Sequence, residues 1–65
     1  MNRLQELRKE KKLTMVDVYF ATGIKMTTLS RYENNKREPK ISYLIKLADY
    51  FNVSIDYLVG RSDER

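Results

Sequence analysis

The feature that most constrains this chain is that it has to fold without a covalent or metal cross-link. Its 65 residues include no cysteine and no histidine. A chain of this size buries only about 60% of the surface that it exposes when unfolded, so its stability has to come from packed secondary structure. Histidine is also the commonest general base and metal ligand. We therefore expect no metal, no cofactor and no enzymatic activity.

Turn-forming residues divide the chain into short segments, and apolar residues recur at helical spacing within these segments. No segment alternates apolar and polar residues for long enough to indicate a strand. The fold class is therefore predicted to be all-α, in a single domain that covers residues 1–65. Helices are predicted over residues 2–12, 15–22, 26–33, 41–51 and 55–59.

Capping residues support the predicted helix ends. Asn2 with Gln5, and Thr14 with Asp17, have the spacing of a capping box, which satisfies two backbone donors at the start of a helix. Gly23 suits the left-handed backbone that ends many helices. The remaining assignments are Ser54 as the cap that starts the fifth helix, and Asn52 and Gly60 as residues that end the last two helices.

Positive charge is concentrated in two stretches of the chain. The net charge is +4, and residues 1–12 and 25–40 each hold five cations and two anions. Such clustering is expected where one face meets a polyanion, although lysines and arginines also keep small domains soluble. The apolar runs are only a few residues long and the N-terminus is charged. We therefore expect neither a signal peptide nor a membrane span, and a cytoplasmic protein.

The stretch "GIKMTTLSRYENNKREP", residues 23–39, combines an apolar side with an unusual polar side. Leu29 and Tyr32 share the core-facing side of its helix, and the opposite side is small, polar and flexible apart from one arginine. A helix with such a side fits the DNA major groove, although an ordinary solvated helix face is the alternative. The candidate base-reading residues are Met26, Thr27, Ser30 and Arg31, and the candidate phosphate-contacting residues are Lys25, Asn34, Asn35, Lys36 and Arg37.

Two helices around a Gly-Ile turn, with Val18, Ile24 and Leu29 spaced to pack them together, form a helix-turn-helix pattern. With the motifs "LSRYENNKREP", "LIKLA" and "DYL", essentially the whole chain resembles the Cro and cI repressor type of helix-turn-helix domain, the XRE family. The resemblance implies a compact five-helix fold like that of the lambda repressor DNA-binding domain. It also implies sequence-specific binding of double-stranded DNA by a transcriptional repressor or regulator, as a homodimer on an inverted-repeat operator.

The resemblance implies roles for single residues as well. In this family the residue that opens the second helix, here Met15, usually contacts a DNA phosphate, as does the loop after the third helix. The third helix reads bases from its early exposed positions, here Met26 and Thr27, and again one turn later. An arginine of the first helix commonly pairs with the glutamate that closes the third helix, which implies a pair between Arg8 and Glu33.

Four residues depart from the family pattern. Met15 replaces the usual glutamine, which implies the loss of a hydrogen bond to DNA. Tyr19 replaces an alanine where the second and third helices come closest, so its phenol has to tilt the helices apart or turn outward. Lys25 replaces a serine or threonine cap, at a cost of about 1 kcal/mol. Asn35 replaces a glycine, and asparagine accepts left-handed backbone better than most residues.

Val16 and Phe20 lie four residues apart on the outward side of the second helix, where charged residues would be ordinary. Scattered exposed apolar residues are normal in soluble proteins and need no partner. The alternative interpretation is a protein-binding module, such as an antitoxin-like or regulatory partner, for which DNA contact is secondary. In that interpretation, Val16 and Phe20 form the partner surface.

Overall fold

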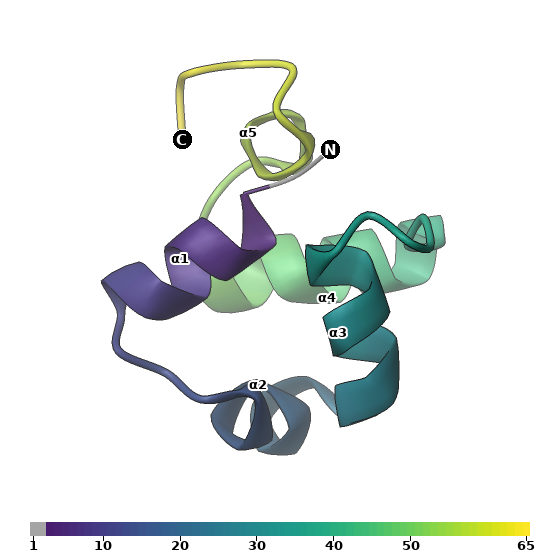
Figure 1. Ribbon diagram of the computed structural model, residues 1–65. Coiled ribbons are helices and arrows are strands. Elements are labelled where there is room, and N and C mark those ends of the chain that lie inside the picture. The colour runs from purple at the N-terminus through teal and green to yellow at the C-terminus, as the bar shows by residue number, and fades with distance from the viewer. Residues whose placement is uncertain (1–2) are drawn as a thin grey trace.

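A computed structural model describes residues 3–65, and over this range the secondary structure is entirely helical (Figure 1). The all-α prediction is confirmed, and the predicted bounds of the last four helices agree with the structure. The helices are α1 (Leu4–Glu10), α2 (Met15–Thr22), α3 (Met26–Glu33), α4 (Ile41–Phe51) and α5 (Ile55–Val59).

The predicted first helix is too long. α1 ends at Glu10, not at residue 12, because Lys12 has a left-handed backbone with φ of 57°. The amide of Leu13 then donates to the carbonyl of Arg8 (3.0 Å), which closes the helix end in a Schellman motif. Asn2 lies outside the described residues, as does its predicted capping box. Arg3 occupies the N-cap position and provides no side-chain cap.

The caps predicted for α2 and α5 are present. The Thr14 hydroxyl accepts a hydrogen bond from the Asp17 amide (3.2 Å), and the Asp17 carboxylate accepts one from the Thr14 amide (2.8 Å). The Ser54 hydroxyl accepts a hydrogen bond from the Tyr57 amide (3.0 Å). Left-handed residues end the helices as predicted, at Gly23 after α2, Asn52 after α4 and Gly60 after α5.

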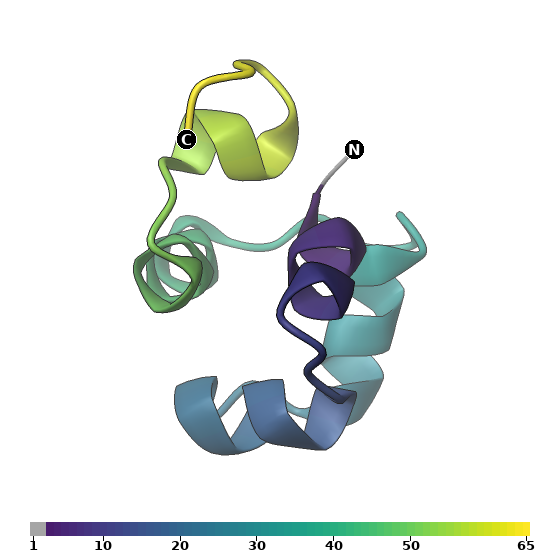
Figure 2. The same ribbon diagram turned by 90° about the vertical axis from the view of Figure 1, so that its left-hand side faces the viewer.

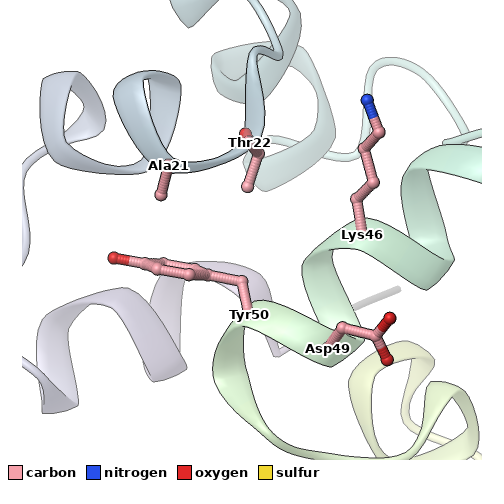
Figure 3. Close-up of a pocket in the computed structure, with 5 residues that line it drawn as sticks. All are labelled: Ala21, Thr22, Lys46, Asp49 and Tyr50. Carbon is pink, nitrogen blue, oxygen red and sulfur yellow. The ribbon is translucent and has the colours of Figure 1, made fainter.

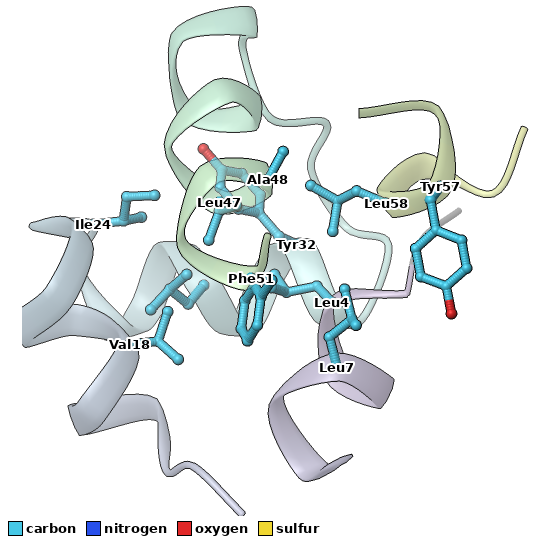
Figure 4. Close-up of a cluster of buried hydrophobic side chains, with 11 residues drawn as sticks. Leu4, Leu7, Val18, Ile24, Tyr32, Leu47, Ala48, Phe51, Tyr57 and Leu58 are labelled. Carbon is cyan, nitrogen blue, oxygen red and sulfur yellow. The ribbon is translucent and has the colours of Figure 1, made fainter. Parts of the chain in front are cut away.

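The core lies where the helices meet, with α2 packed on α3 and α4, α1 on α3, and α5 on α4 (Figure 4). In both overall views α2 and α5 lie at opposite ends of the molecule (Figures 1 and 2). None of the helices in residues 3–65 is both long enough and apolar enough to cross a membrane. The buried hydrophobic residues are Leu4, Leu7, Val18, Ile24, Leu29, Tyr32, Leu47, Ala48, Phe51, Tyr57 and Leu58.

Candidate nucleic-acid interface

The turn between α2 and α3 fixes the position of α3. Gly23 adopts φ of 76°, a backbone conformation that is unfavourable for residues with a Cβ. The buried Thr22 hydroxyl donates to the Val18 carbonyl (2.7 Å) and accepts a hydrogen bond from the Ile24 amide (3.3 Å). Ile24 then enters the core. The role of Thr22 is not predicted from the sequence, although a threonine side chain within a helix often bonds the carbonyl four residues earlier.

The ion pair between Arg8 and Glu33, implied by the resemblance, is present and joins α1 to the end of α3. Arg8 donates from Nε to one Glu33 oxygen (2.7 Å) and from Nη2 to the other (3.1 Å), and its Nη1 donates to the Leu13 carbonyl (2.9 Å). The Glu33 side chain is 2% exposed and that of Arg8 is 14% exposed. The hydrogen bond to Glu33 raises the pKa of Arg8 above its ordinary value. This pair therefore orients α3 from inside the fold.

The predicted base-reading residues differ in their exposure. Met26, Thr27 and Arg31 are exposed on α3, in the positions that a helix in a groove would present. Ser30 is half-buried, and the Asn34 amide nitrogen donates to its carbonyl (2.9 Å) and to its hydroxyl (3.4 Å). Asn34 thus holds Ser30 at the end of α3, a contact that is not visible in the sequence.

Five of the predicted phosphate-contacting residues are exposed, either at the start of α3 or in the loop after it. Lys25 stands at the N-cap position and makes no side-chain capping bond, as its lack of a hydroxyl predicts. Asn35 has a left-handed backbone with φ of 58°. Met15 differs, because it is half-buried and packs against the core. The exposed residues are Lys25, Asn34, Asn35, Lys36 and Arg37.

Two arginines near α5, Arg3 and Arg65, are each paired with an acid. Arg3 lies 2.7 Å from the Asp63 carboxylate, and Arg65 lies 2.8 Å from that of Glu10. Both guanidinium groups also face the Tyr57 ring, at 4.0 Å and 5.2 Å from its centroid. Residues 61–65 are thereby fastened to α1 and α5. The two ion pairs are missed in the sequence because they join residues 60 and 55 positions apart.

The cations near α3 take part in no ion pair of residues 3–65. Residues 3–65 contain three ion pairs, which engage Arg3, Arg8 and Arg65. None involves a cation of the stretch 25–40. Unpaired exposed cations create a positive potential that attracts a polyanion. The cations of this stretch are Lys25, Arg31, Lys36, Arg37 and Lys40.

The outward side of α2 is apolar. Phe20 is 80% exposed and Val16 is 43% exposed, as predicted for this side. Tyr19 is 38% exposed, and its ring packs against that of Phe20 with 5.3 Å between centroids. Of the two outcomes expected for Tyr19, the structure therefore shows the outward one. We call Val16, Tyr19 and Phe20 the α2 patch.

A shallow depression of about 470 Å³ lies between α2 and α4 (Figure 3). Tyr50 lies beneath Ala21 there, and Lys46 and Asp49 place opposite charges on the same rim. Within residues 3–65 no three side chains of the types Cys, His, Asp and Glu come together as a metal site. The described surface therefore offers no convergent set of metal ligands.

Comparisons with known proteins agree with this geometry. The family model described as helix-turn-helix matches residues 4–58. The HTH-type transcriptional regulator AnsR of Bacillus subtilis is 35% identical over 65 residues, which are 100% of this chain and 56% of AnsR. The HTH-type transcriptional regulator ImmR of the same organism is 36% identical over 61 residues, 94% of this chain and 48% of ImmR.

A phage protein is similar to the same extent. The cryptic phage CTXphi transcriptional repressor RstR of Vibrio cholerae is 36% identical over 59 residues, which are 91% of this chain and 53% of RstR. The chain thus spans about half the length of the curated relatives it matches.

Proposed function

Because this chain belongs to the Cro/cI-type (XRE) helix-turn-helix family of transcriptional regulators, a non-enzymatic class, we propose that it represses transcription by binding a specific sequence of double-stranded DNA. The observation that supports this most strongly is the exposure of Arg31 and its neighbours on α3, beside cations that no acid neutralises. An α-helix with its side chains is about 10 to 12 Å in diameter, so α3, a helix of eight residues, fits into the major groove, which is about 12 Å wide.

In the proposed complex, α3 lies in the major groove. Arg31 donates two hydrogen bonds to the O6 and N7 atoms of a guanine, and Met26 and Thr27 contact base edges and thymine methyl groups. Ser30 reads a base only if its hydroxyl turns away from Asn34. The backbone phosphates are held by Lys25 and the loop residues Asn34, Asn35, Lys36 and Arg37, with Met15 at the rim of the groove.

We further propose that the protein acts as a homodimer. Transcriptional regulators of this fold place two recognition helices on one face of the duplex, so the half-sites of an inverted repeat lie about 10 to 10.5 base pairs apart, centre to centre. A two-fold dimer also makes both half-sites identical in sequence. We therefore propose that two copies of this chain contact each other on the DNA.

Selection of binding sites from a randomised duplex pool, followed by footprinting, tests the proposal. We expect an enriched inverted repeat and two protected half-sites on one face of the DNA. Single half-sites at saturating protein concentration would contradict the dimer. An unenriched pool, with affinity equal for all sequences, would contradict sequence-specific binding itself.

A second candidate function is a contact with a protein partner through the α2 patch. Its support is the 80% exposure of Phe20 next to Val16 and Tyr19, a position that does not belong to the proposed DNA surface. Phe20→Glu should abolish capture of that partner and leave the fold and DNA affinity unchanged. Lys9→Glu on α1 is a control for added negative charge. Loss of thermal stability in Phe20→Glu would instead assign Phe20 to the fold.

A further inference from the structure

A second cavity, of about 250 Å³, lies between α3, the loop that follows it and α4. Three cations line it from two segments: Lys25 before α3, and Arg37 and Lys40 in the loop between α3 and α4. Thr28, Tyr32 and Tyr43 are among the other residues that line it. No aspartate or glutamate lines this cavity.

An aromatic ring lies beside one of the three cations, and the charge of a second acts on a buried tyrosine. The Lys40 ammonium lies 4.9 Å from the centre of the Tyr43 ring, within the range of a cation–π contact. Burial raises the pKa of Tyr32, and the nearby charge of Arg37 partly opposes that rise. None of the three cations takes part in an ion pair of residues 3–65. Their charges therefore add, and the cavity is a site of positive potential.

Size and polarity define the chemistry that the cavity can accept. Water occupies about 30 Å³ per molecule in the liquid, so a group of several heavy atoms fits. Guanidinium, ammonium and hydroxyl groups all donate hydrogen bonds to phosphate oxygens. The depression between α2 and α4 has a different character, because an acid, Asp49, lines it together with Lys46 (Figure 3).

The cavity also lies beside the proposed DNA surface. Thr28 follows the exposed Met26 and Thr27 on α3, and Lys25 precedes them. A sugar–phosphate strand that borders the groove occupied by α3 therefore passes the mouth of the cavity. Building on the proposed function, we propose that this cavity binds one phosphate group, and that in the DNA complex a single backbone phosphate is shared by Lys25, Arg37 and Lys40.

Sharing has a measurable consequence in the salt dependence of DNA binding. Each neutralised phosphate contributes about 0.9 to the slope of log affinity against log salt concentration. If one phosphate is shared, the triple variant Lys25→Gln, Arg37→Gln, Lys40→Gln should lower the slope by about 0.9 in total. Three separate phosphates would give a loss of about 2.7. Either that larger loss or an unchanged slope overturns the proposal.

A matched control is Arg61→Gln, because Arg61 is exposed, follows α5 in the chain and does not line the cavity. It should leave the slope unchanged, and an equal loss there would show a general charge effect and overturn the assignment. Thermal denaturation of each variant shows that the fold is retained. If the triple variant unfolds, the pair Arg37→Gln, Lys40→Gln is used, for which one shared phosphate still predicts a loss of no more than about 0.9.

Inorganic phosphate tests the cavity without DNA. Added to the whole chain at constant ionic strength, it should shift the backbone amide resonances of Thr28 and Tyr43 in a saturable way, and Lys40→Gln should weaken that response several-fold. Chloride should not reproduce the shifts. If phosphate leaves both resonances unmoved, the cavity is not a phosphate site. If phosphate binds but the wild-type protein binds no DNA, the proposed function fails and the cavity remains a site for a free phosphate.

Discussion

The arginines near α5 and the cations beside α3 have the same formal charge and very different surroundings. Arg3 and Arg65 are each paired with a carboxylate and lie near the Tyr57 ring. Arg31 and Arg37 are exposed and belong to no ion pair of residues 3–65. Arg3 and Arg65 hold residues 61–65 against the first helix and the residue before it. Arg31 and Arg37 leave their charge available to a ligand.

The comparison shows what a charge count can and cannot establish. Residues 1–12 and 25–40 have the same net charge of +3, and the sequence therefore predicts two equivalent basic stretches. In the structure, two arginines of the first stretch, Arg3 and Arg8, serve the fold. The pairing of charges depends on residues distant in sequence, so local charge density alone does not identify the binding surface.

The largest effect should come from breaking the buried pair of Arg8 and Glu33, which contrasts most strongly with the free cations. Arg8→Met leaves the Glu33 carboxylate, only 2% exposed, without its partner, and such losses cost about 3 to 5 kcal/mol. The double variant Arg8→Met, Glu33→Leu should be more stable than Arg8→Met alone. Chemical denaturation of the four proteins in a double-mutant cycle measures this. Additive single effects would show that the pair is not coupled.

A smaller but more specific effect should separate Arg31 from Lys36. Arg31→Ala should reduce discrimination at one base pair per half-site by about 1 to 3 kcal/mol. Lys36→Ala should weaken all sequences equally and lower the salt slope by about one. Both should change the free energy of unfolding by less than about 0.5 kcal/mol, because both residues are exposed. Site selection and titrations at several salt concentrations measure both. If Arg31→Ala changes only the salt slope, Arg31 contacts a phosphate.

The smallest effect should come from the exposed pair of Glu10 and Arg65. A hydrogen bond from Arg65 lowers the pKa of Glu10 below its ordinary value of 4.5. The pair therefore stabilises the fold at pH values above 4.5, and this contribution is lost as the pH falls through the lowered pKa. Glu10→Gln should flatten that part of the stability profile, measured by denaturation between pH 3 and 7 at low salt.

Glu6→Gln is the control for this measurement, since Glu6 lies on the same helix and outside the three ion pairs. It should keep the wild-type acid profile. Identical profiles for Glu10→Gln and the wild type would show that solvent screens the pair completely.

Local signals predict most of the fold. The capping box of Thr14 and Asp17, the left-handed Gly23 and the apolar spacing of α4 each depend on residues within a few positions of one another, so their pattern is visible in the sequence. The end of α1 is mispredicted because Lys12 takes a left-handed backbone that lysine rarely adopts. No local signal marks that position.

The candidate site is predicted in part for the same reason. The spacing along a helix places Met26, Thr27 and Arg31 on one exposed side. Asn34 bonds the Ser30 carbonyl from four positions away, whereas the cavity of Lys25, Arg37 and Lys40 depends on how the loop folds toward α4. That cavity follows from tertiary packing, which a helical periodicity does not contain.

Three helix ends have a residue other than glycine with a left-handed backbone, at Lys12, Asn35 and Asn52. Each such residue strains the backbone, by about 1 to 2 kcal/mol for a residue like lysine and less for asparagine. Replacing such a residue with glycine should therefore raise the thermal stability of the fold. Lys12 lies beyond the end of α1 and is not among the residues proposed to contact DNA, so Lys12→Gly should raise the thermal stability without changing the proposed base-reading residues.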